Sequence, residues 1–413
     1  MGKRSNMNRP ELLSPAGNFE KMRAAIRYGA DAVYLAGEVF GMRAAADNFS
    51  VDELMEATAY AHERGVKVYL TVNTMPRENE YPLLENYFRK LKNIPLDALI
   101  IADLGVLFLA KEMLPEKELH VSTQASSVSS HDCRAWASLG AKRVVLAREV
   151  SLEEIKIIRQ NIPDDIELEC FVHGSMCVSY SGRCLLSNHL VGRDANRGMC
   201  AQPCRWNYKA YEIVEEKRPD CKMPIEEEGG ETFIMSSRDT CTIEHIPELV
   251  EAGINSFKIE GRMKSAYYTA VVTNTYRMAL DSYFSGDYKY DPAWLRELES
   301  VSHRDYNTGY YFADSHADAN IASTTGYIRE KAYLAVVESY DETTGLALMT
   351  QRNKMLFGDA AELLTPGEVG KPLSVGELFD ENMAPIPATP HPYMKFYMKT
   401  PFPVKEGDIL RAV

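Results

Sequence analysis

Roughly the first 285 residues alternate between short apolar runs and longer amphipathic stretches. The apolar runs are rich in valine, isoleucine and leucine and end at polar residues, which is typical of strands buried on both faces of a sheet. The amphipathic stretches 51–64 and 131–139 stop at Gly65 and Gly140, where a glycine can supply the left-handed residue that ends a helix. The alternation therefore predicts repeated β/α units around a parallel sheet.

Nine of the apolar runs have the character of strands. They cover residues 11–13, 32–35, 67–73, 98–102, 119–122, 143–146, 166–172, 232–235 and 256–260. Eight or nine units within about 275 residues fit a closed (β/α)8 barrel, the TIM-like fold, better than an open doubly wound sheet. No G-x-G-x-x-G follows any of the runs, so nothing in the sequence supports a dinucleotide-binding fold.

The character of the sequence changes after residue 285. Residues 286–320 are rich in tyrosine, glycine and aspartate and are interpreted as a linker. Residues 321–413 contain short alternating runs, such as 334–340 and 393–398, that are separated by turns and prolines. The sequence thus predicts an α/β protein, with a TIM-like barrel over 1–285 and a small all-β domain, a β-barrel, over 321–413.

Polar side chains stand where nearly every predicted barrel strand ends. Functional residues of such barrels occupy these ends. A single residue there is commonly a cap or a turn residue, but so many together predict a polar pocket at the barrel mouth. The positions are Ser14 to Asn18, Asn73, Asp103, Thr123, Gln124, Arg148, His173, Ser237 to Asp239, and Glu260 to Arg262.

Four cysteines, Cys177, Cys184, Cys200 and Cys204, fall within 28 residues directly after a predicted strand. Four thiolates that converge need a cation, and the usual ones are zinc or an iron–sulfur cluster. Zinc sites favour two C-x2–4-C pairs, whereas the first pair here is C-x6-C, which favours a [4Fe–4S] cluster. Core cysteines are the alternative, although the intervening residues are not apolar. Cys241 is the reserve fourth ligand.

Positive charge gathers over residues 183–209, which overlap the cysteine segment 169–206, in a chain whose net charge is −13. Arg193, Arg197 and Arg205 lie near Tyr180 and other aromatic residues, and arginines beside stackable rings suit a single-stranded RNA loop. These three arginines are therefore the candidate RNA-binding residues. Tuning of the cluster, or pairing with the glutamate-rich residues 212–231, is the alternative.

The composition limits the protein's surface charge, its relation to membranes and its cellular compartment. An excess of acids excludes a surface coated in basic charge but not a local basic patch. No run reaches the ~20 apolar residues that span a bilayer, and the polar start does not resemble a signal peptide. Eight cysteines without such a signal predict a protein of the reducing cytoplasm, with no membrane partner.

Residues 169–187 resemble, at every position, the signature E-x-F-x-x-G-[SA]-[LIVM]-C-x4-G-x-C-x-[LIVM]-S of the U-thirty-two family of collagenase-like peptidases. Residues 11–18, 29–34 and 258–262 are similar to other blocks of that family, so the resemblance covers essentially the whole chain. Within the family, residues 193–206 and the chain length resemble the branch that hydroxylates tRNA. The branch acting on ribosomal RNA is typically longer, and the branch of ubiquinone hydroxylation typically lacks the C-terminal module.

For the tRNA branch, the resemblance implies an iron–sulfur protein that uses prephenate in forming 5-hydroxyuridine at the wobble position of tRNA. Prephenate carries two carboxylates, and Arg148, Arg238, Lys258 and Arg262 lie at strand ends where they can hold them. Glu260 can instead hold Arg262 in a structural ion pair. The candidate catalytic residues are Arg148, His173, Glu260 and Arg262.

The family name implies a second function, that of a peptidase. Peptide hydrolysis needs an activated nucleophile, a carboxylate pair or a metal with an open position, and the sequence has neither H-E-x-x-H nor G-x-S-x-G. His173 lies close to Cys177 in sequence and can form a Cys–His pair, but a thiolate that binds a cluster is not free to attack a substrate. Hydroxylation of ribosomal RNA and a non-catalytic assembly or binding role are further alternatives.

Overall fold

The protein divides into two compact units. The computed structural model describes residues 8–42, 47–177, 179–180, 184–205, 213–215, 218–223, 226–228, 231–233, 237–313, 328 and 331–413. The first unit is formed by 1–22, 31–263 and 303–327, and the second by 23–30, 264–302 and 328–413. The predicted barrel boundary at residue 285 falls at the end of a helix that belongs to the second unit.

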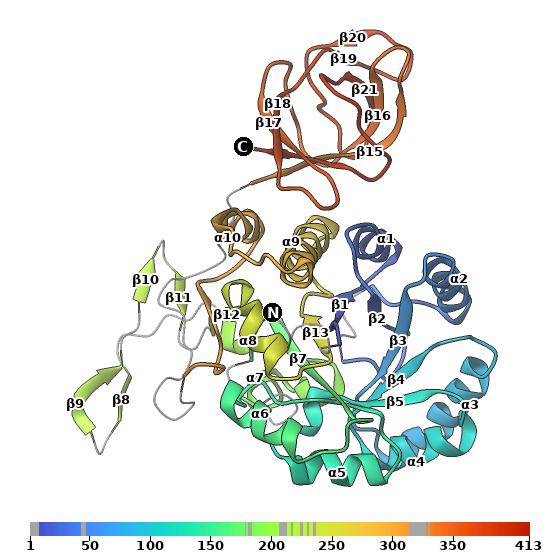
Figure 1. Ribbon diagram of the computed structural model, residues 1–413, viewed down its shortest axis with the longest axis vertical. Coiled ribbons are helices and arrows are strands. Elements are labelled where there is room, and N and C mark those ends of the chain that lie inside the picture. The colour runs from blue at the N-terminus through green and yellow to red at the C-terminus, as the bar shows by residue number, and fades with distance from the viewer. Residues whose placement is uncertain are drawn as a thin grey trace. The chain divides into compact units, whose positions relative to one another are not determined.

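Eight parallel strands of the first unit close into a barrel (Figure 1). Each strand pairs with the next along the chain, and β13 closes the ring by pairing in parallel with both β7 and β1. The predicted (β/α)8, TIM-like barrel is therefore confirmed. The strands are β1 (Glu11–Pro15), β2 (Ala32–Ala36), β3 (Lys67–Val72), β4 (Ala98–Ile101), β5 (Glu118–Val121), β6 (Arg143–Val145), β7 (Glu167–Ser175) and β13 (Ser256–Ile259).

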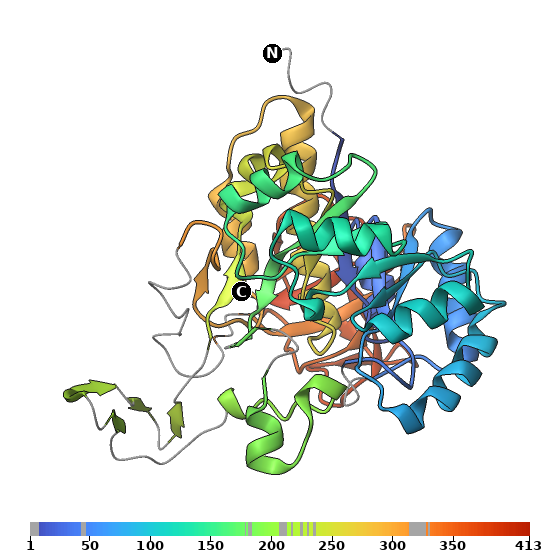
Figure 2. The same ribbon diagram turned by 90° about the horizontal axis from the view of Figure 1, so that it is seen from below.

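Helices cover the outside of these strands (Figures 1 and 2). Their starts are capped as elementary helix chemistry requires, since the side chains of Ser50, Asp103, Ser129 and Ser151 accept hydrogen bonds from the backbone three residues on. The helices include α2 (Val51–His62), α3 (Tyr81–Leu91), α4 (Leu104–Met113), α5 (Ser130–Ser138), α6 (Leu152–Gln160) and α8 (Ile246–Glu251). The helix α1 (Phe19–Arg27) is shared between the two units.

The long connection between β7 and β13 carries the cysteine segment and several short elements. Leu186–Val191 form α7, and the single turns η4 (Ala195–Arg197) and η5 (Pro203–Arg205) follow. Two antiparallel hairpins come next, and then a strand antiparallel to β7 that also pairs with β14 (Tyr306–Asn307). These elements are β8 (Ile213–Glu215), β9 (Arg218–Met223), β10 (Glu226–Glu228), β11 (Glu231–Phe233) and β12 (Asp239–Cys241).

The predicted ninth barrel strand, 232–235, is not part of the barrel. Its described residues belong to β11, which pairs with the glutamates of β10. Strands with so many charged residues cannot be buried on both faces as barrel strands are. Residues 234–236 lie outside the described part of the chain.

The second unit contains an eight-stranded antiparallel sheet that curves as a half-barrel, which confirms the small all-β domain. Its core includes Val337, Met349, Phe396, Met398 and Leu410. The strands are β15 (Tyr333–Asp341), β16 (Leu346–Gln351), β17 (Ala360–Leu364), β18 (Lys371–Ser374), β19 (Leu378–Phe379), β20 (Pro385–Ile386), β21 (Lys395–Lys399) and β22 (Ile409–Ala412).

Two helices, α9 (Ala266–Ser285) and α10 (Pro292–Glu299), belong to the same unit. The buried guanidinium of Arg411 in β22 joins Glu297 of α10, with two contacts of 2.7 Å, to Glu362 of β17 at 2.9 Å. Residues 286–320 are thus no plain linker in their described part, because they hold α10 and β14. No described helix is long and apolar enough to cross a membrane.

Candidate functional site

A cavity of about 150 Å³ opens at the carboxyl ends of the barrel strands. Its walls come from two sources: residues at the ends of the strands, and residues of the segment 177–204 that follows β7. This is the face on which TIM-like barrels carry their active sites. The structure therefore joins the predicted strand-end pocket and the predicted cysteine site in one place.

All four cysteines of the predicted cluster, Cys177, Cys184, Cys200 and Cys204, line this cavity. Cys177 is exposed and the other three are half-buried, and the backbone N–H of Gln202 donates a hydrogen bond of 3.4 Å to the sulfur of Cys200. In chemical type the donor set fits an iron–sulfur cluster. Among the described residues, however, no group of three or more histidine, cysteine or acidic side chains is close enough to hold a single metal ion.

Three further cysteines, whose burial the structure describes, do not line the cavity. Cys133, Cys170 and Cys241 are buried, and none of them lines it. Burial raises the pKa of Cys133 to about 11 and that of Cys170 further still. Cys241, the reserve ligand, pairs in β12 opposite His173.

Among the described residues, three cations and one carboxylate line the cavity: Arg148, Lys258, Arg262 and Glu260. Arg148 donates to the carbonyl of Ser175 at 2.6 Å and lies 3.4 Å from Glu260 Oε2. Its guanidinium carbon is 4.0 Å from the centre of the Phe171 ring. Glu260 thus forms an ion pair with Arg148 and helps to fix its orientation.

Arg262 is buried beside the loop that follows β1. Its carbonyl accepts a hydrogen bond of 3.2 Å from Lys21, and a Cβ atom on Gly17 would lie only 2.4 Å from this carbonyl oxygen. Glycine at position 17 is therefore required by the close approach of the two loops. The contact holds the backbone of Arg262 at the edge of the cavity.

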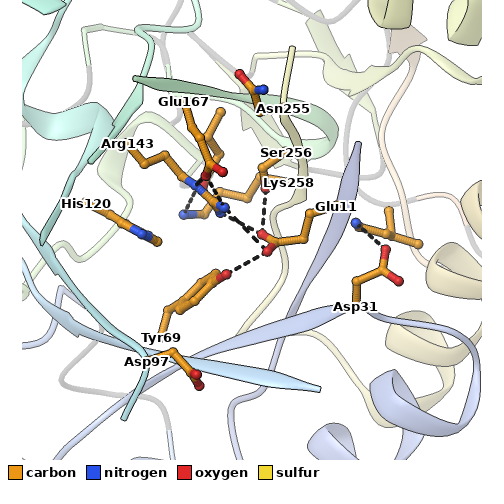
Figure 3. Close-up of polar contacts among 12 residues, drawn as sticks. Glu11, Asp31, Tyr69, Asp97, His120, Arg143, Glu167, Asn255, Ser256 and Lys258 are labelled. Atoms are coloured by element: carbon orange, nitrogen blue, oxygen red, sulfur yellow. Dashed lines mark hydrogen bonds and ion pairs between the residues drawn. The ribbon is translucent and has the colours of Figure 1, made fainter. Parts of the chain in front are cut away.

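The floor of the cavity rests on a buried ionic network. Lys258 Nζ lies 2.7 Å from Glu169 Oε1, and Arg143 lies 3.2 Å from Glu169 Oε2 and 2.6 Å from Glu11. Tyr69 donates to Glu11 at 2.6 Å, and Figure 3 shows its hydroxyl pointing at that carboxylate. Burial alone would raise the pKa of Glu169, but Lys258 and Arg143 outweigh it and leave the pKa below its ordinary value. Glu169 is therefore ionised and keeps a cation, Lys258, at the floor.

His173, a predicted catalytic residue, does not line the cavity. Its buried ring lies in β7, with its centre 5.3 Å from that of Tyr306 and its Nε2 atom 3.4 Å from the Tyr306 hydroxyl. Arg238 does not line the cavity either. Asp103 and Asn18 act as helix caps, accepting hydrogen bonds from Val106 and Lys21.

The predicted RNA-binding arginines are engaged with other parts of the chain. Arg193 donates to the carbonyl of Met199 at 3.1 Å, and Arg197 forms an ion pair with Glu80, which precedes α3. The side chain of Arg205 lies outside the described part of the structure. Part of the positive charge of this segment is thus balanced by Glu80.

Several polar residues of the cavity wall were not singled out by sequence reasoning. Thr71 and Ser122 line the cavity beside Asn73 and Gln124, which sequence reasoning placed at strand ends without a role. Glu169 belongs to the matched signature, yet its partner Lys258 lies 89 residues away. The only feature of the sequence that could have pointed to these wall residues was their position at or near the end of a predicted strand.

Comparison with known proteins places the chain among relatives of two kinds. Profiles described as Peptidase family U32 and Peptidase family U32 C-terminal domain match residues 17–321 and 329–411. The chain is 35% identical to tRNA hydroxylation protein P1 of Bacillus subtilis, over 99% of this chain and 96% of that protein. It is 37% identical to tRNA hydroxylation protein P of Escherichia coli, over 87% of each chain. It is also 32% identical to a collagenase of Porphyromonas gingivalis, over 87% of this chain and 88% of the relative.

Proposed function

Since the chain belongs to peptidase family U32 and is similar to two tRNA hydroxylation proteins over 96% and 87% of their lengths, we propose that it hydroxylates RNA. Its substrate is tRNA, its co-substrate is prephenate and its product is 5-hydroxyuridine at the wobble position. One observation carries this proposal: four cysteines and three cations line a single cavity at the barrel mouth.

The proposed cofactor is a [4Fe–4S] cluster held by Cys177, Cys184, Cys200 and Cys204. When bound, such a cluster supplies redox chemistry that the side chains of the cavity do not have. The cations serve a different purpose, because Arg148 and Arg262 can each hold a carboxylate through two parallel hydrogen bonds. Lys258 adds a point charge at the floor, so that the cavity can take a small acid with two carboxylates.

The peptidase alternative has less support in the cavity. Among the described lining residues there is a single carboxylate, Glu260, and it is paired with Arg148. His173 does not line the cavity with Cys177, so the described site holds no histidine base for a cysteine nucleophile. Redox chemistry on RNA therefore accounts for the lining residues better than hydrolysis does.

The test is analysis of modified nucleosides in RNA from cells that lack this protein. We expect 5-hydroxyuridine derivatives to disappear from tRNA and to return with the wild-type gene but not with Cys200→Ser. Loss of a modified nucleoside from ribosomal RNA instead would assign the other RNA substrate. Unchanged nucleosides in both RNA classes, together with collagen hydrolysis by the purified protein, would support the peptidase.

A further inference from the structure

Two amide side chains in the cavity wall each have a buried oxygen without a hydrogen-bond partner in the described part of the chain. Asn73 follows β3 and is 9% exposed, and Gln124 follows β5 and is 6% exposed. The Oδ1 atom of Asn73 and the Oε1 atom of Gln124 are the two oxygens concerned. Buried acceptors without a donor are rare in folded proteins because leaving them unsatisfied is costly. Both side chains line the cavity, so a ligand there can supply what they lack.

Ser122 links the two amides into one polar group. Its hydroxyl oxygen accepts a hydrogen bond of 3.2 Å from Asn73 Nδ2 and one of 3.4 Å from the backbone N–H of Gln124. A hydroxyl oxygen that accepts two bonds still has its own hydrogen to donate. We call Asn73 and Gln124 the amide pair. Together with Ser122 they offer hydrogen-bond acceptors and a donor at neighbouring points of the cavity wall.

By strand order, the amide pair lies across the barrel mouth from two of the cations, Lys258 and Arg262. Around the closed ring, β3 is three strands from β13 on one side and β5 is three strands from β13 on the other. The strand between them, β4, is directly opposite β13 in a ring of eight. Lys258 lies in β13 and Arg262 shortly after it, so a ligand spanning the mouth meets cations at one end and neutral amides at the other.

Apolar surface lines the cavity between the two ends and also at the amide end. Tyr34, Ile100 and Phe171 also line the cavity, and they come from β2, β4 and β7. A ligand with an apolar body such as a ring, a charged group at one end and an uncharged polar group at the other would match the cationic, apolar and amide parts of the wall.

We propose that Asn73 and Gln124 determine specificity by hydrogen-bonding a hydroxyl group at the end of the co-substrate that is remote from its carboxylate. A hydroxyl can donate its one hydrogen to one of the two amide oxygens and accept a hydrogen bond from the Ser122 hydroxyl, whereas a second carboxylate cannot donate to either oxygen and would lie far from Lys258 and Arg262. The proposal rests on the proposed function for the identity of the co-substrate. The preference of the cavity for a remote hydroxyl group does not depend on that identity, because it applies to any ring-containing acid of this shape.

The test uses two probes that differ by one hydroxyl: 3-(4-hydroxyphenyl)propionate and 3-phenylpropionate. Binding to the full-length protein is measured by calorimetry, alongside prephenate. Two hydrogen bonds of ordinary net strength correspond to roughly 10- to 100-fold in Kd, which is the preference expected of the wild type for the hydroxylated probe. Sites built to bind a hydroxyl reject the analogue that lacks it for the same reason.

The variants are Asn73→Leu, Gln124→Met and the smaller change Ser122→Ala. We expect the two amide variants to bind 3-phenylpropionate as the wild type does while losing most of the preference for the hydroxylated probe. Ser122→Ala removes little volume and should also reduce the preference for the hydroxylated probe. It therefore replaces either amide variant in the test if that variant fails to fold. Gln160→Met, on the exposed end of α6, is the matched control and should keep the full preference.

Three results would overturn the proposal: an equal preference in the wild type and the amide variants, equal affinity of the wild type for both probes, or no binding of either probe. Weaker tRNA binding by the amide variants with an unchanged hydroxyl preference would assign the amides to a nucleobase and equally overturn it. Failure of prephenate alone to bind, with the preference intact, would contradict the proposed co-substrate and support the amide assignment.

Discussion

Glu169 and Lys258 form a buried ion pair of 2.7 Å between the neighbouring strands β7 and β13, and Lys258 lines the cavity that the cysteines also line. The pair places two opposite charges on the strands where β13 pairs with β7 and closes the ring. Lys258 Nζ also lies 4.5 Å from the centre of the Tyr34 ring, in a cation–π contact. A cation is thus held at the floor of the site by Glu169, whose side chain is fully buried.

Breaking this pair should destabilise the barrel strongly. Glu169→Gln leaves the buried Lys258 and Arg143 short of their counter-charge, and loss of one partner of such a pair typically costs about 3–5 kcal/mol. Urea unfolding measures the change in free energy. Lys156→Ala is the control, because it breaks an exposed ion pair with Glu153 and should change stability by less than about 1 kcal/mol. Equal effects of the two variants would contradict a special role of the buried pair.

The same carboxylate should make stability depend on pH. The pKa of Glu169 in the folded protein is held below its ordinary value of 4.5, so its ionised form favours folding. Its contribution is complete above about pH 4.5 and is lost as the pH falls through the lower folded value. Urea midpoints measured from pH 6 to pH 3 should therefore fall more steeply for the wild type than for Glu169→Gln. Parallel curves would show that Glu169 does not titrate as inferred.

The cysteine assignment predicts the iron content of the protein. Anaerobically purified wild type should carry about four irons per chain and absorb in the visible range, as a [4Fe–4S] cluster does. Ser substitutions at Cys177, Cys184, Cys200 or Cys204 should each lower the iron content, whereas Cys133→Ser, in the core, should not. Stoichiometric zinc without iron would refute the cluster, and loss of iron in Cys241→Ser would show that the fourth ligand was assigned wrongly.

The basic segment predicts weaker RNA binding when its charge is reversed. Replacing Arg193, Arg197 and Arg205 by glutamate should weaken tRNA binding, lower its dependence on salt and leave the iron content unchanged. Because Arg197 pairs with Glu80, the variant Glu80→Gln is the matched control for loss of that ion pair. If Glu80→Gln weakens binding as much as the triple variant does, the arginines act by shaping the segment rather than by contacting phosphate.

Arg262 should not tolerate lysine if it holds a carboxylate. The planar guanidinium can form two parallel hydrogen bonds to a carboxylate, and an ammonium group cannot. Arg262→Lys should therefore lose wobble-uridine hydroxylation in cells while keeping the visible absorbance of the purified protein. Near-normal hydroxylation would remove Arg262 from the site and leave Arg148, whose orientation Glu260 helps to fix, as the principal clamp.

The sequence by itself determined the barrel strands, because their signal is local. Each buried parallel strand must be apolar over its whole length, and each helix between them needs an amphipathic face and capped ends, so eight of nine runs were assigned correctly. The run 232–235 misled because it is apolar, yet it lies among glutamates that exclude burial in a barrel. Helix α10 was missed within the apparent linker because its residues are few and are flanked by tyrosine and glycine.

Only the tertiary structure decided which strand-end residues face one another. Ring closure through β13 brings Lys258 to Glu169, and the neighbourhood of β3 and β5 across β4 brings Asn73 to Ser122, 49 residues further along the chain. It also pairs Glu260 with Arg148 rather than leaving it beside Arg262 alone, and it buries His173 against Tyr306 away from the cavity. Such contacts depend on strand order, register and the direction of each side chain, and residue type along the chain encodes none of these directly.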